Sequence, residues 1–283
     1  MASIPPDPEV VNDLVCYGAG AMYLEQLQLK SIGQGDLEFP LSLPLPQQLD
    51  ALDFEQPVTY FIGENGAGKS TLLEGIAAAT RLPALVHTAP LSSAGRTLAR
   101  HLRLVRKRAM QAGFFFRADD VTGFLSGIAA AKLEFQDMAQ EFTSIKGEWG
   151  RDRAVGMARA QAAALDAKYG EDPFAQSHGE IFLSLLRGRI TAPGLYLMDE
   201  PESPLSPGNK IALLALIMDK VKAGSQFIIA THSPILMACP DATIYDFDRQ
   251  PPEPVAWVEV EHVALTRAFL NNPESFLRHF SDK

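Results

Sequence analysis

The sequence predicts an α/β fold in which a mostly parallel sheet is flanked by helices on both faces. Short apolar runs rich in β-branched and aromatic residues alternate along the chain with longer segments of helical periodicity. Such alternation is typical of strand–helix–strand units, whose buried parallel strands are continuous apolar runs. The chain has 283 residues, of which 47% are hydrophobic, so it can build the core of one large domain or two small ones.

Composition argues against several classes of protein. The formal net charge is −9, which argues against a protein whose whole surface binds nucleic acid. Cys16 and Cys239 are the only cysteines, so a disulfide framework is excluded. No apolar run approaches the roughly 18 residues needed to cross a bilayer. Residues 5–9 are prolines and acids where a secretory signal would be basic and then apolar, so we expect a cytoplasmic protein.

The first part of the chain is expected to contain two antiparallel strands before the parallel sheet begins. Alternating leucines predict the first strand, and two nearby glycines predict a hairpin to the second. A buried strand then stops at a glycine and leads into a helix. The expected elements are a flexible leader over 1–9, strands over 23–32 and 36–41, a rigid proline loop at Pro40, Pro44 and Pro46, a strand over 58–62 and a helix over 69–79.

The middle of the chain changes character. Alanine, leucine, arginine and glutamine dominate it, and its periodicity is helical, so we expect an inserted helical lobe. The chain would then be one domain of residues 1–283, with a core lobe of about 20–85 and 189–283 and a helical lobe of about 86–188. The later elements are expected to be helices over 178–188 and 207–223, strands over 195–198, 227–230, 243–248 and 255–260, and a short terminal helix ending near residue 280.

A phosphate-binding loop is expected between the strand at 58–62 and the helix that follows. The segment matches G-x-x-x-x-G-K-[ST], and its glycines allow backbone N–H groups to face phosphates. Lys69 would reach the terminal phosphates, and the Ser70 hydroxyl would ligate Mg²⁺. The alternative is a glycine-rich turn that binds nothing. The expected phosphate-binding residues are Gly63, Glu64, Asn65, Gly66, Ala67, Gly68, Lys69, Ser70 and Thr71.

A second motif narrows the class, since a P-loop alone leaves kinase, GTPase and ATPase open. The apolar run at 195–198 ends in Asp199 and Glu200. Ligand sites of open α/β sheets lie at the carboxyl ends of the strands, so Asp199 is expected to hold Mg²⁺. Glu200 is placed to act as general base toward the attacking water. The alternative is an acidic strand end that is merely solvated.

Two further features point to the same edge of the sheet. His232 follows the apolar strand at 227–230 and would contact the γ-phosphate or the attacking water. Ser177 and Glu180 open a helix in the pattern of a capping box, and Ser177 with Gly179 would also offer an anion site at the helix N-terminus. A structural histidine and a simple helix cap are the alternatives.

The order of these motifs resembles that of the ABC-type P-loop ATPases, closest to compact ATPases similar to RecF-like and SMC-like proteins. The resemblance extends from about residue 23 to residue 280. By resemblance, 63–71 is the Walker A loop, Asp199 and Glu200 are the Walker B pair, 176–180 is the signature and His232 is the switch histidine. The resemblance implies ATP and Mg²⁺ as cofactors. It also implies a homodimer in which the signature of one copy closes on the ATP of the other.

The sequence departs from the family pattern at several positions. The signature reads Gln176, Ser177, His178, Gly179 and Glu180 instead of Leu-Ser-Gly-Gly-Gln, and Ser206 stands where an aspartate is typical. Gln111 is a candidate for the Q-loop glutamine, although an ordinary helix-end residue fits it better. Tyr23 and Phe39 are the candidates for stacking on adenine.

The segment from Arg96 to Arg108 is basic although the protein is acidic. Arg96, Arg100, Arg103 and Lys107 would share one face of a helix. Contact with nucleic-acid phosphates is the functional hypothesis for this face, and a solvated amphipathic helix is the preferred alternative. The order of the motifs makes an ATP-hydrolysing dimer the leading hypothesis, with a role in repair, regulation or defence. The other classes are a transporter's nucleotide-binding subunit and a non-hydrolysing scaffold gated by ATP. A transporter subunit would need a membrane partner on the helical lobe, and the altered signature and the lack of a clear Q-loop glutamine argue against it.

Overall fold

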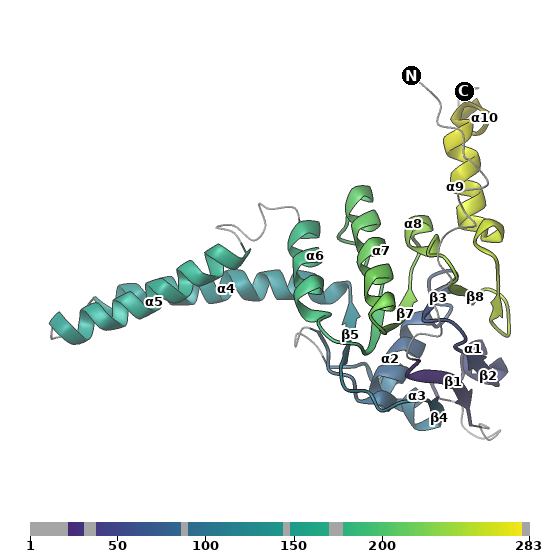
Figure 1. Ribbon diagram of the computed structural model, residues 1–283, viewed down its shortest axis with the longest axis horizontal. Coiled ribbons are helices and arrows are strands. Elements are labelled where there is room, and N and C mark those ends of the chain that lie inside the picture. Colours follow the sequence, from purple (N-terminus) through teal and green to yellow (C-terminus); the bar gives the residue numbers. More distant parts are fainter. Residues whose placement is uncertain (1–21, 31–37, 86–89, 144–147, 170–177, 279–283) are drawn as a thin grey trace.

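The computed structural model describes residues 22–30, 38–85, 90–143, 148–169 and 178–278, and Figure 1 shows their arrangement. A six-stranded sheet forms the centre, and a three-stranded antiparallel sheet packs beside it. The expected α/β class with a mostly parallel sheet and antiparallel N-terminal strands is confirmed. Cys239 is buried and free, whereas Cys16 and the expected leader lie outside the described residues.

The central sheet has the strand order β5-β6-β7-β3-β8-β9. All of its neighbouring pairs are parallel except β8 with β9, so the carboxyl ends of five strands lie at one edge. The strands are β3 (Val58–Ile62), β5 (Gly113–Arg117), β6 (Leu195–Asp199), β7 (Gln226–Ala230), β8 (Thr243–Asp246) and β9 (Glu253–Pro254).

Both faces of the central sheet are buried. Along β3, Tyr60 packs on the face covered by α6, α7 and α8, and Phe61 packs on the face covered by α2 and the second sheet. Because successive side chains of a strand point to opposite faces, a strand between two layers must be apolar throughout. The covering helices are α2 (Lys69–Thr80), α6 (His178–Arg189), α7 (Pro207–Lys222) and α8 (Pro234–Met237).

The second sheet differs from the expected hairpin. Its central strand β1 (Leu24–Leu29) pairs antiparallel with β2 (Ala51–Asp53) and β4 (Leu102–Arg106). Residue 38 has no regular structure and residues 39–41 form turns, so the expected partner strand at 36–41 is wrong for its described part; residues 36–37 lie outside the described residues. Proline provides no N–H for a strand ladder but suits the first turn of a helix. Pro44 accordingly begins the short helix α1 (Pro44–Gln48) instead of a loop.

The expected basic helix is also wrong beyond residue 101. The helix α3 (Ser93–His101) ends there, and β4 begins at Leu102. Leu102 and Leu104 pair with Leu29 and Leu27 of β1, and this long-range pairing prevails over the helical periodicity of the segment. The segment expected to be a helical lobe therefore contributes β4 and β5 to the two sheets.

Two long helices, α4 (Asp119–Phe142) and α5 (Glu148–Tyr169), form an antiparallel arm that projects from the β5 side of the sheet (Figure 1). An ion pair between the buried Lys132 and the partly exposed Asp166 joins them.

The C-terminal part differs from expectation at residues 255–260. These residues form the 3₁₀ turn η1 (Trp257–Glu259) rather than a strand, and Trp257 Nε1 donates a hydrogen bond to the carbonyl of Pro234. Anchoring of the indole to α8 and burial of Val260 in the core turn the chain away from the sheet. The helices α9 (Glu261–Asn271) and α10 (Pro273–Leu277) follow and project from the body (Figure 1).

Candidate nucleotide-binding site

Three neighbouring strands carry the expected site residues to one edge of the central sheet. The P-loop follows β3, Asp199 ends β6, and His232 follows β7, which lies between the other two. Their parallel direction brings the P-loop together with side chains more than a hundred residues later in the chain. Gly63, Glu64, Asn65, Gly66, Ala67, Gly68, Lys69, Ser70 and Thr71 run from the end of β3 into the first turn of α2.

The P-loop bends in a way that requires glycine at its start. Gly63 has a φ of +133°, and a Cβ there would lie 2.9 Å from Asp248 Oδ1 and 3.2 Å from the Asp248 backbone nitrogen. The loop ends at the N-terminus of α2, which has no side-chain cap and no acidic residue in its first turn. Unpaired N–H groups at a helix N-terminus favour an anion, so this geometry suits phosphate.

Lys69 is nearly buried, and its ammonium is held by the loop itself. Nζ donates hydrogen bonds to the carbonyls of Gly63 and Glu64, at 2.6 and 2.7 Å. Burial lowers the pKa of Lys69, while the carboxylates of Asp248, Glu200 and Asp199 oppose that shift. The ammonium therefore lies among three acids, and a bound triphosphate would compete with the two carbonyls for it.

Ser70 and Asp199 meet across the end of β7. The Ser70 hydroxyl donates a hydrogen bond to Asp199 Oδ1 at 3.1 Å. Burial raises the pKa of Asp199 to about 6; the Ser70 hydrogen bond opposes the shift, and the nearby Glu200 and Glu74 add to it. A carboxylate made costly by burial and like charge is one that a cation would stabilise.

This pair fits Mg²⁺ by its chemistry. A hydroxyl and a carboxylate oxygen are hard ligands, and Mg²⁺ typically takes only one or two from a protein, with phosphates and water completing its shell. Among the described residues, no group of three or more His, Cys, Asp and Glu side chains could hold a metal ion. The site thus suits a metal that arrives with a nucleotide rather than an all-protein metal centre.

Glu200 and His232 face each other at the mouth of the site. Glu200 Oε1 lies 3.8 Å from His232 Nε2, and both side chains are about two-fifths exposed. Glu200 adopts a φ of +49°, which is uncommon for a residue with a side chain and is typical of functional sites. Ser203 Oγ donates to Glu200 Oε2 at 3.2 Å. With Glu64 and Asn65, the pair lines an open pocket of about 510 Å³.

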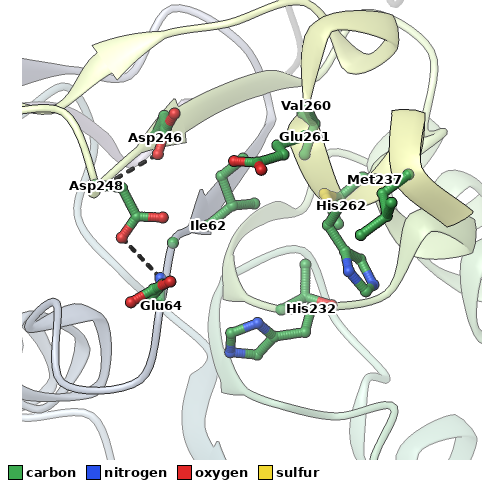
Figure 2. A pocket seen from close by; sticks show the side chains of 12 residues that line it. Ile62, Glu64, His232, Met237, Asp246, Asp248, Val260, Glu261 and His262 are labelled. Atoms are coloured by element: carbon green, nitrogen blue, oxygen red, sulfur yellow. Dashed lines mark hydrogen bonds between the residues drawn. The ribbon is translucent and has the colours of Figure 1, made fainter. Parts of the chain in front are cut away.

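A second pocket, of about 310 Å³, lies between the start of the P-loop and α9 (Figure 2). Asp248 Oδ1 accepts a hydrogen bond from the Glu64 backbone N–H at 2.7 Å, and Asp246 accepts from the Asp248 N–H at 3.0 Å. His232 and His262 line the pocket as well. Asp248 thereby ties the loop after β8 to the P-loop.

The signature segment is described only from residue 178, so Gln176 and Ser177, with the expected cap, lie outside the described residues. Gly179 is buried in the first turn of α6, where a Cβ would lie 2.7 Å from Asn209 Nδ2 and 3.2 Å from the Pro204 carbonyl oxygen. The glycine lets α6 approach the turn after β6, and its contact with phosphate stays a prediction. Ser206 caps α7 by accepting a hydrogen bond from the Asn209 N–H.

Two of the auxiliary candidates do not reach the site. Gln111 precedes β5, at the amino-terminal edge of the sheet, so it is not placed as a Q-loop residue. Tyr23 is buried, and its N–H binds Gln226 at the start of β7, so it also lies at the wrong edge for adenine. Phe39 is exposed in the turn before α1, whose Leu45 packs against Gly68 of the P-loop. Stacking of adenine on Phe39 stays a prediction.

Sequence reasoning missed a charged cluster next to Asp199. Arg117 ends β5 in register with Asp199 and contacts Glu74 Oε1 at 2.9 Å and Asp120 Oδ1 at 3.3 Å. Burial and these two carboxylates act on its pKa in opposite directions, and the net shift is upward. Glu74 lies on α2 and Asp120 on α4, so Arg117 joins the P-loop helix to the arm. A cation ending the aromatic run at 113–117 was the only signal in the sequence.

The basic segment does not form the single face expected for a nucleic-acid contact. Arg103 pairs with Gln28 on β1, whereas the Arg106 guanidinium donates to the Ala79 carbonyl at the end of α2. Lys107 forms an ion pair with Glu25. The shared helical face of Arg96, Arg100, Arg103 and Lys107 is therefore wrong, because the segment changes from helix to strand. A nucleic-acid contact over 96–108 stays a prediction without that support.

Comparison with known proteins gives matches in both halves of the site. Residues 41–81 match a family model described as "AAA domain", and 181–238 match one described as "AAA domain, putative AbiEii toxin, Type IV TA system". Within the described residues, no helix is both long and apolar enough to cross a membrane.

Two curated relatives are ATP-binding proteins. One, the lipoprotein-releasing system ATP-binding protein LolD of Cereibacter sphaeroides, is 32% identical over 123 residues, which cover 39% of this chain and 55% of the relative. The other, the hemin import ATP-binding protein HmuV of Streptomyces coelicolor, is 27% identical over 198 residues, which cover 67% of this chain and 65% of the relative. The chain thus spans less than two thirds of the length of either relative.

Solved structures with a similar fold include an Smc head domain from Pyrococcus furiosus, at 15% identity and a TM-score of 0.44, covering 88% of this chain and 99% of that one. Another is cbiO1 from Clostridium perfringens, part of the ABC transporter complex cbiONQ, at 17% identity and a TM-score of 0.44, covering 89% and 96% of the two chains. The family models and the curated relatives agree with the order of the motifs along the sheet edge, and together they support an ABC-type P-loop ATPase.

Proposed function

We propose that this protein binds ATP together with Mg²⁺ and hydrolyses the bond between the β- and γ-phosphates, which releases ADP and inorganic phosphate. The observation that carries the proposal is the hydrogen bond from Ser70 to Asp199, because it brings the P-loop half and the acidic half of the site together. Mg²⁺, when bound with ATP, would neutralise charge on the phosphate oxygens.

The residues of the chain would divide the remaining work. Backbone N–H groups of residues 63–71 and the Lys69 ammonium would bind the phosphates, while Ser70 and Asp199 would hold the metal. The Glu200 carboxylate would accept a proton from the attacking water, and His232, 3.8 Å away, would orient that water or the γ-phosphate. Hydrolysis thus depends mainly on positioning and electrostatics, as in other phosphoryl transfers.

Phosphate release from ATP, measured with and without Mg²⁺, tests the proposal. Glu200→Gln keeps the size of the side chain but removes the base, and it should lower kcat at least about 10²-fold. Glu55→Gln, an exposed glutamate before β3, is the matched control and should leave kcat unchanged. Equal turnover in the two variants would refute the assignment of Glu200.

We further propose that the active form is a homodimer closed by ATP. The Glu200–His232 pocket is open to solvent on one chain, and Ser177 and Gly179 of a second copy would cover it. In this proposal residues 1–283 form a single ATPase domain located in the cytoplasm. Roles in repair, regulation and defence are the cellular functions it would suit.

A transporter subunit is the second candidate function, because LolD and HmuV are named as ATP-binding proteins of lipoprotein release and hemin import. The test is purification of the chain, tagged in its native host, from detergent-solubilised membranes and from the soluble fraction. Stoichiometric recovery with an integral membrane protein would favour the transporter. Recovery of an ATP-dependent homodimer without such a protein would favour the first candidate.

A further inference from the structure

Glu202 is a buried carboxylate that the proposed chemistry does not use. It lies two residues after Glu200, in the turn that follows β6, and only 6% of its surface is exposed. Its Oε1 accepts two hydrogen bonds, from the Thr231 hydroxyl at 2.6 Å and from the His232 backbone N–H at 2.8 Å. Its Oε2 is buried, and no hydrogen-bond partner for it lies among the described residues. Burial of a carboxylate is costly, so a functional or structural reason for Glu202 is required.

The hydrogen bond from the His232 N–H to Glu202 extends the ladder between β6 and β7 by one step beyond the last backbone–backbone hydrogen bond of that ladder. The Glu200 N–H still donates to the Ala230 carbonyl of β7, at 2.9 Å. At Glu200, with its φ of +49°, the chain leaves the direction of β6. The chain after β6 therefore presents no backbone carbonyl to the next N–H of the β7 segment that points toward it. That N–H belongs to His232, and the Glu202 side chain supplies the missing acceptor.

The same turn carries the proposed base. The Ser203 N–H donates to the Glu200 carbonyl at 3.0 Å, and the Leu205 N–H donates to the Glu202 carbonyl at 2.9 Å, so the two glutamates are parts of one hydrogen-bonded turn. On the other side, the Thr231 hydroxyl accepts from the Ser233 N–H at 3.0 Å. Glu202 is thus the side chain that connects the turn bearing Glu200 to the segment bearing His232.

We propose that Glu202 is a positioning residue for hydrolysis, which sets the placement of His232 relative to Glu200 through its hydrogen bonds to Thr231 and the His232 backbone. This inference rests on the proposed function. Misplacement of a reacting group by about 1 Å can cost about 10²-fold in rate, so the role predicts an effect on kcat rather than on ATP affinity.

Two substitutions of Glu202 separate this role from a general loss of structure. Glu202→Gln keeps a side-chain oxygen that can accept both hydrogen bonds, and we expect kcat within about 3-fold of the unsubstituted protein. Glu202→Ala removes the acceptor, and we expect kcat to fall about 10²-fold while the KM for ATP changes less than about 2-fold. An equal fall in kcat for the two variants would overturn the proposal.

A double-mutant cycle supplies the decisive measurement. If Glu202 acts through His232, Glu202→Ala should lower kcat less than about 2-fold further when made in a His232→Ala background. The same loss in both backgrounds would show that Glu202 does not act through His232. Gln226→Met is the control for a loss of stability without a loss of positioning. Gln226 is buried at the start of β7, at the opposite end of the strand from His232, and its side chain binds the backbone of Tyr23 and Leu24. It should lower the melting temperature and leave kcat per folded molecule unchanged.

Failure of this inference and failure of the proposed function give different results. If Glu200→Gln abolishes turnover but the effects of Glu202→Ala and His232→Ala are additive, only the positioning role is wrong. If Glu200→Gln leaves turnover intact, the hydrolytic site itself is wrongly assigned.

Discussion

The hydroxyl of Ser70 lies 3.1 Å from Asp199 Oδ1, although the two residues are 129 positions apart in the chain. Ser70 is placed by the first turn of α2, and Asp199 by the last residue of β6, with the end of β7 between them. This hydrogen bond marks the place where Mg²⁺ would bind. Without nucleotide and metal, burial of the ionised Asp199 carboxylate is unfavourable for folding.

Asp199→Asn should stabilise the nucleotide-free protein near neutral pH. An acid whose pKa is raised to about 6 in the folded state, against 3.8 as its ordinary value, penalises folding once it is ionised. The penalty is absent below about pH 4, grows as the pH rises to about 6 and is then constant, at about 3 kcal/mol at most. Thermal melts from pH 4 to pH 8 should show the variant gaining stability over the unsubstituted protein across this interval. A constant difference would contradict the prediction.

The same variant should lose the response to ligand. Adding Mg²⁺ and ATP should raise the melting temperature of the unsubstituted protein, because a ligand that binds only the folded state stabilises it. Asp199→Asn weakens the metal site, so its gain with Mg²⁺–ATP should shrink to the gain seen with ATP and a chelator. An undiminished Mg²⁺-dependent gain would exclude Asp199 as a metal ligand.

Gly63→Ala should harm the P-loop more than Gly66→Ala. Both glycines have positive φ, at +133° and +90°, and strain of this kind costs about 1–3 kcal/mol for other residues. Only at Gly63 would the new Cβ also meet Asp248, whereas nothing lies within 4 Å of a Cβ at Gly66. Urea unfolding and binding of a fluorescent ATP analogue should show the larger loss for Gly63→Ala. Equal losses would mean that Asp248 moves away from the new Cβ at no measurable cost in free energy.

Arg117→Met should destabilise the fold by about 3–5 kcal/mol. The Arg117 guanidinium contacts Glu74 and Asp120, whose side chains are only 9% and 4% exposed, and removing it leaves these carboxylates without that cation. Arg249→Met is the control, because Arg249 is half exposed beside Asp246 and Glu253, and exposed pairs contribute about 0–1 kcal/mol. Chemical denaturation measures the free energy of unfolding of both variants. Similar small losses in the two would show that water solvates Glu74 and Asp120 once the guanidinium is removed.

Glu200→Gln should trap an ATP-bound dimer. Without a base the variant should retain ATP, so the closed pair of chains should persist. Light scattering after size exclusion should give a monomer mass without nucleotide and a dimer mass with Mg²⁺–ATP. Lys69→Ala, which removes a phosphate contact, should stay monomeric in both conditions. A Glu200→Gln variant that remains monomeric with ATP would exclude the ATP-closed homodimer.

Prediction from sequence succeeded where local signals were dense. The apolar runs ending at residues 62, 198 and 230 and the helices beginning at 69, 178 and 207 all lie where their patterns indicated. It was wrong where a partner far along the chain decided the conformation. The segment after His101 is helical by periodicity but becomes β4 because β1 offers it a strand edge, and Trp257 leaves the strand pattern to bind the Pro234 carbonyl.

The sequence by itself determined the parallel sheet and the loop that suits phosphate, because these depend on burial of whole strands and on glycines adjacent in the chain. Only the tertiary structure decided that Arg117 joins α2 to α4 and that Glu202 supports His232. Neither set of partners can be read from the neighbouring sequence, since a buried charge is recognisable only by the partners that fold around it. Gln111 shows the same limit in reverse: the sequence offered it as a candidate Q-loop residue beside the better-fitting alternative of a helix end, and the direction of β5 put it at the opposite edge of the sheet.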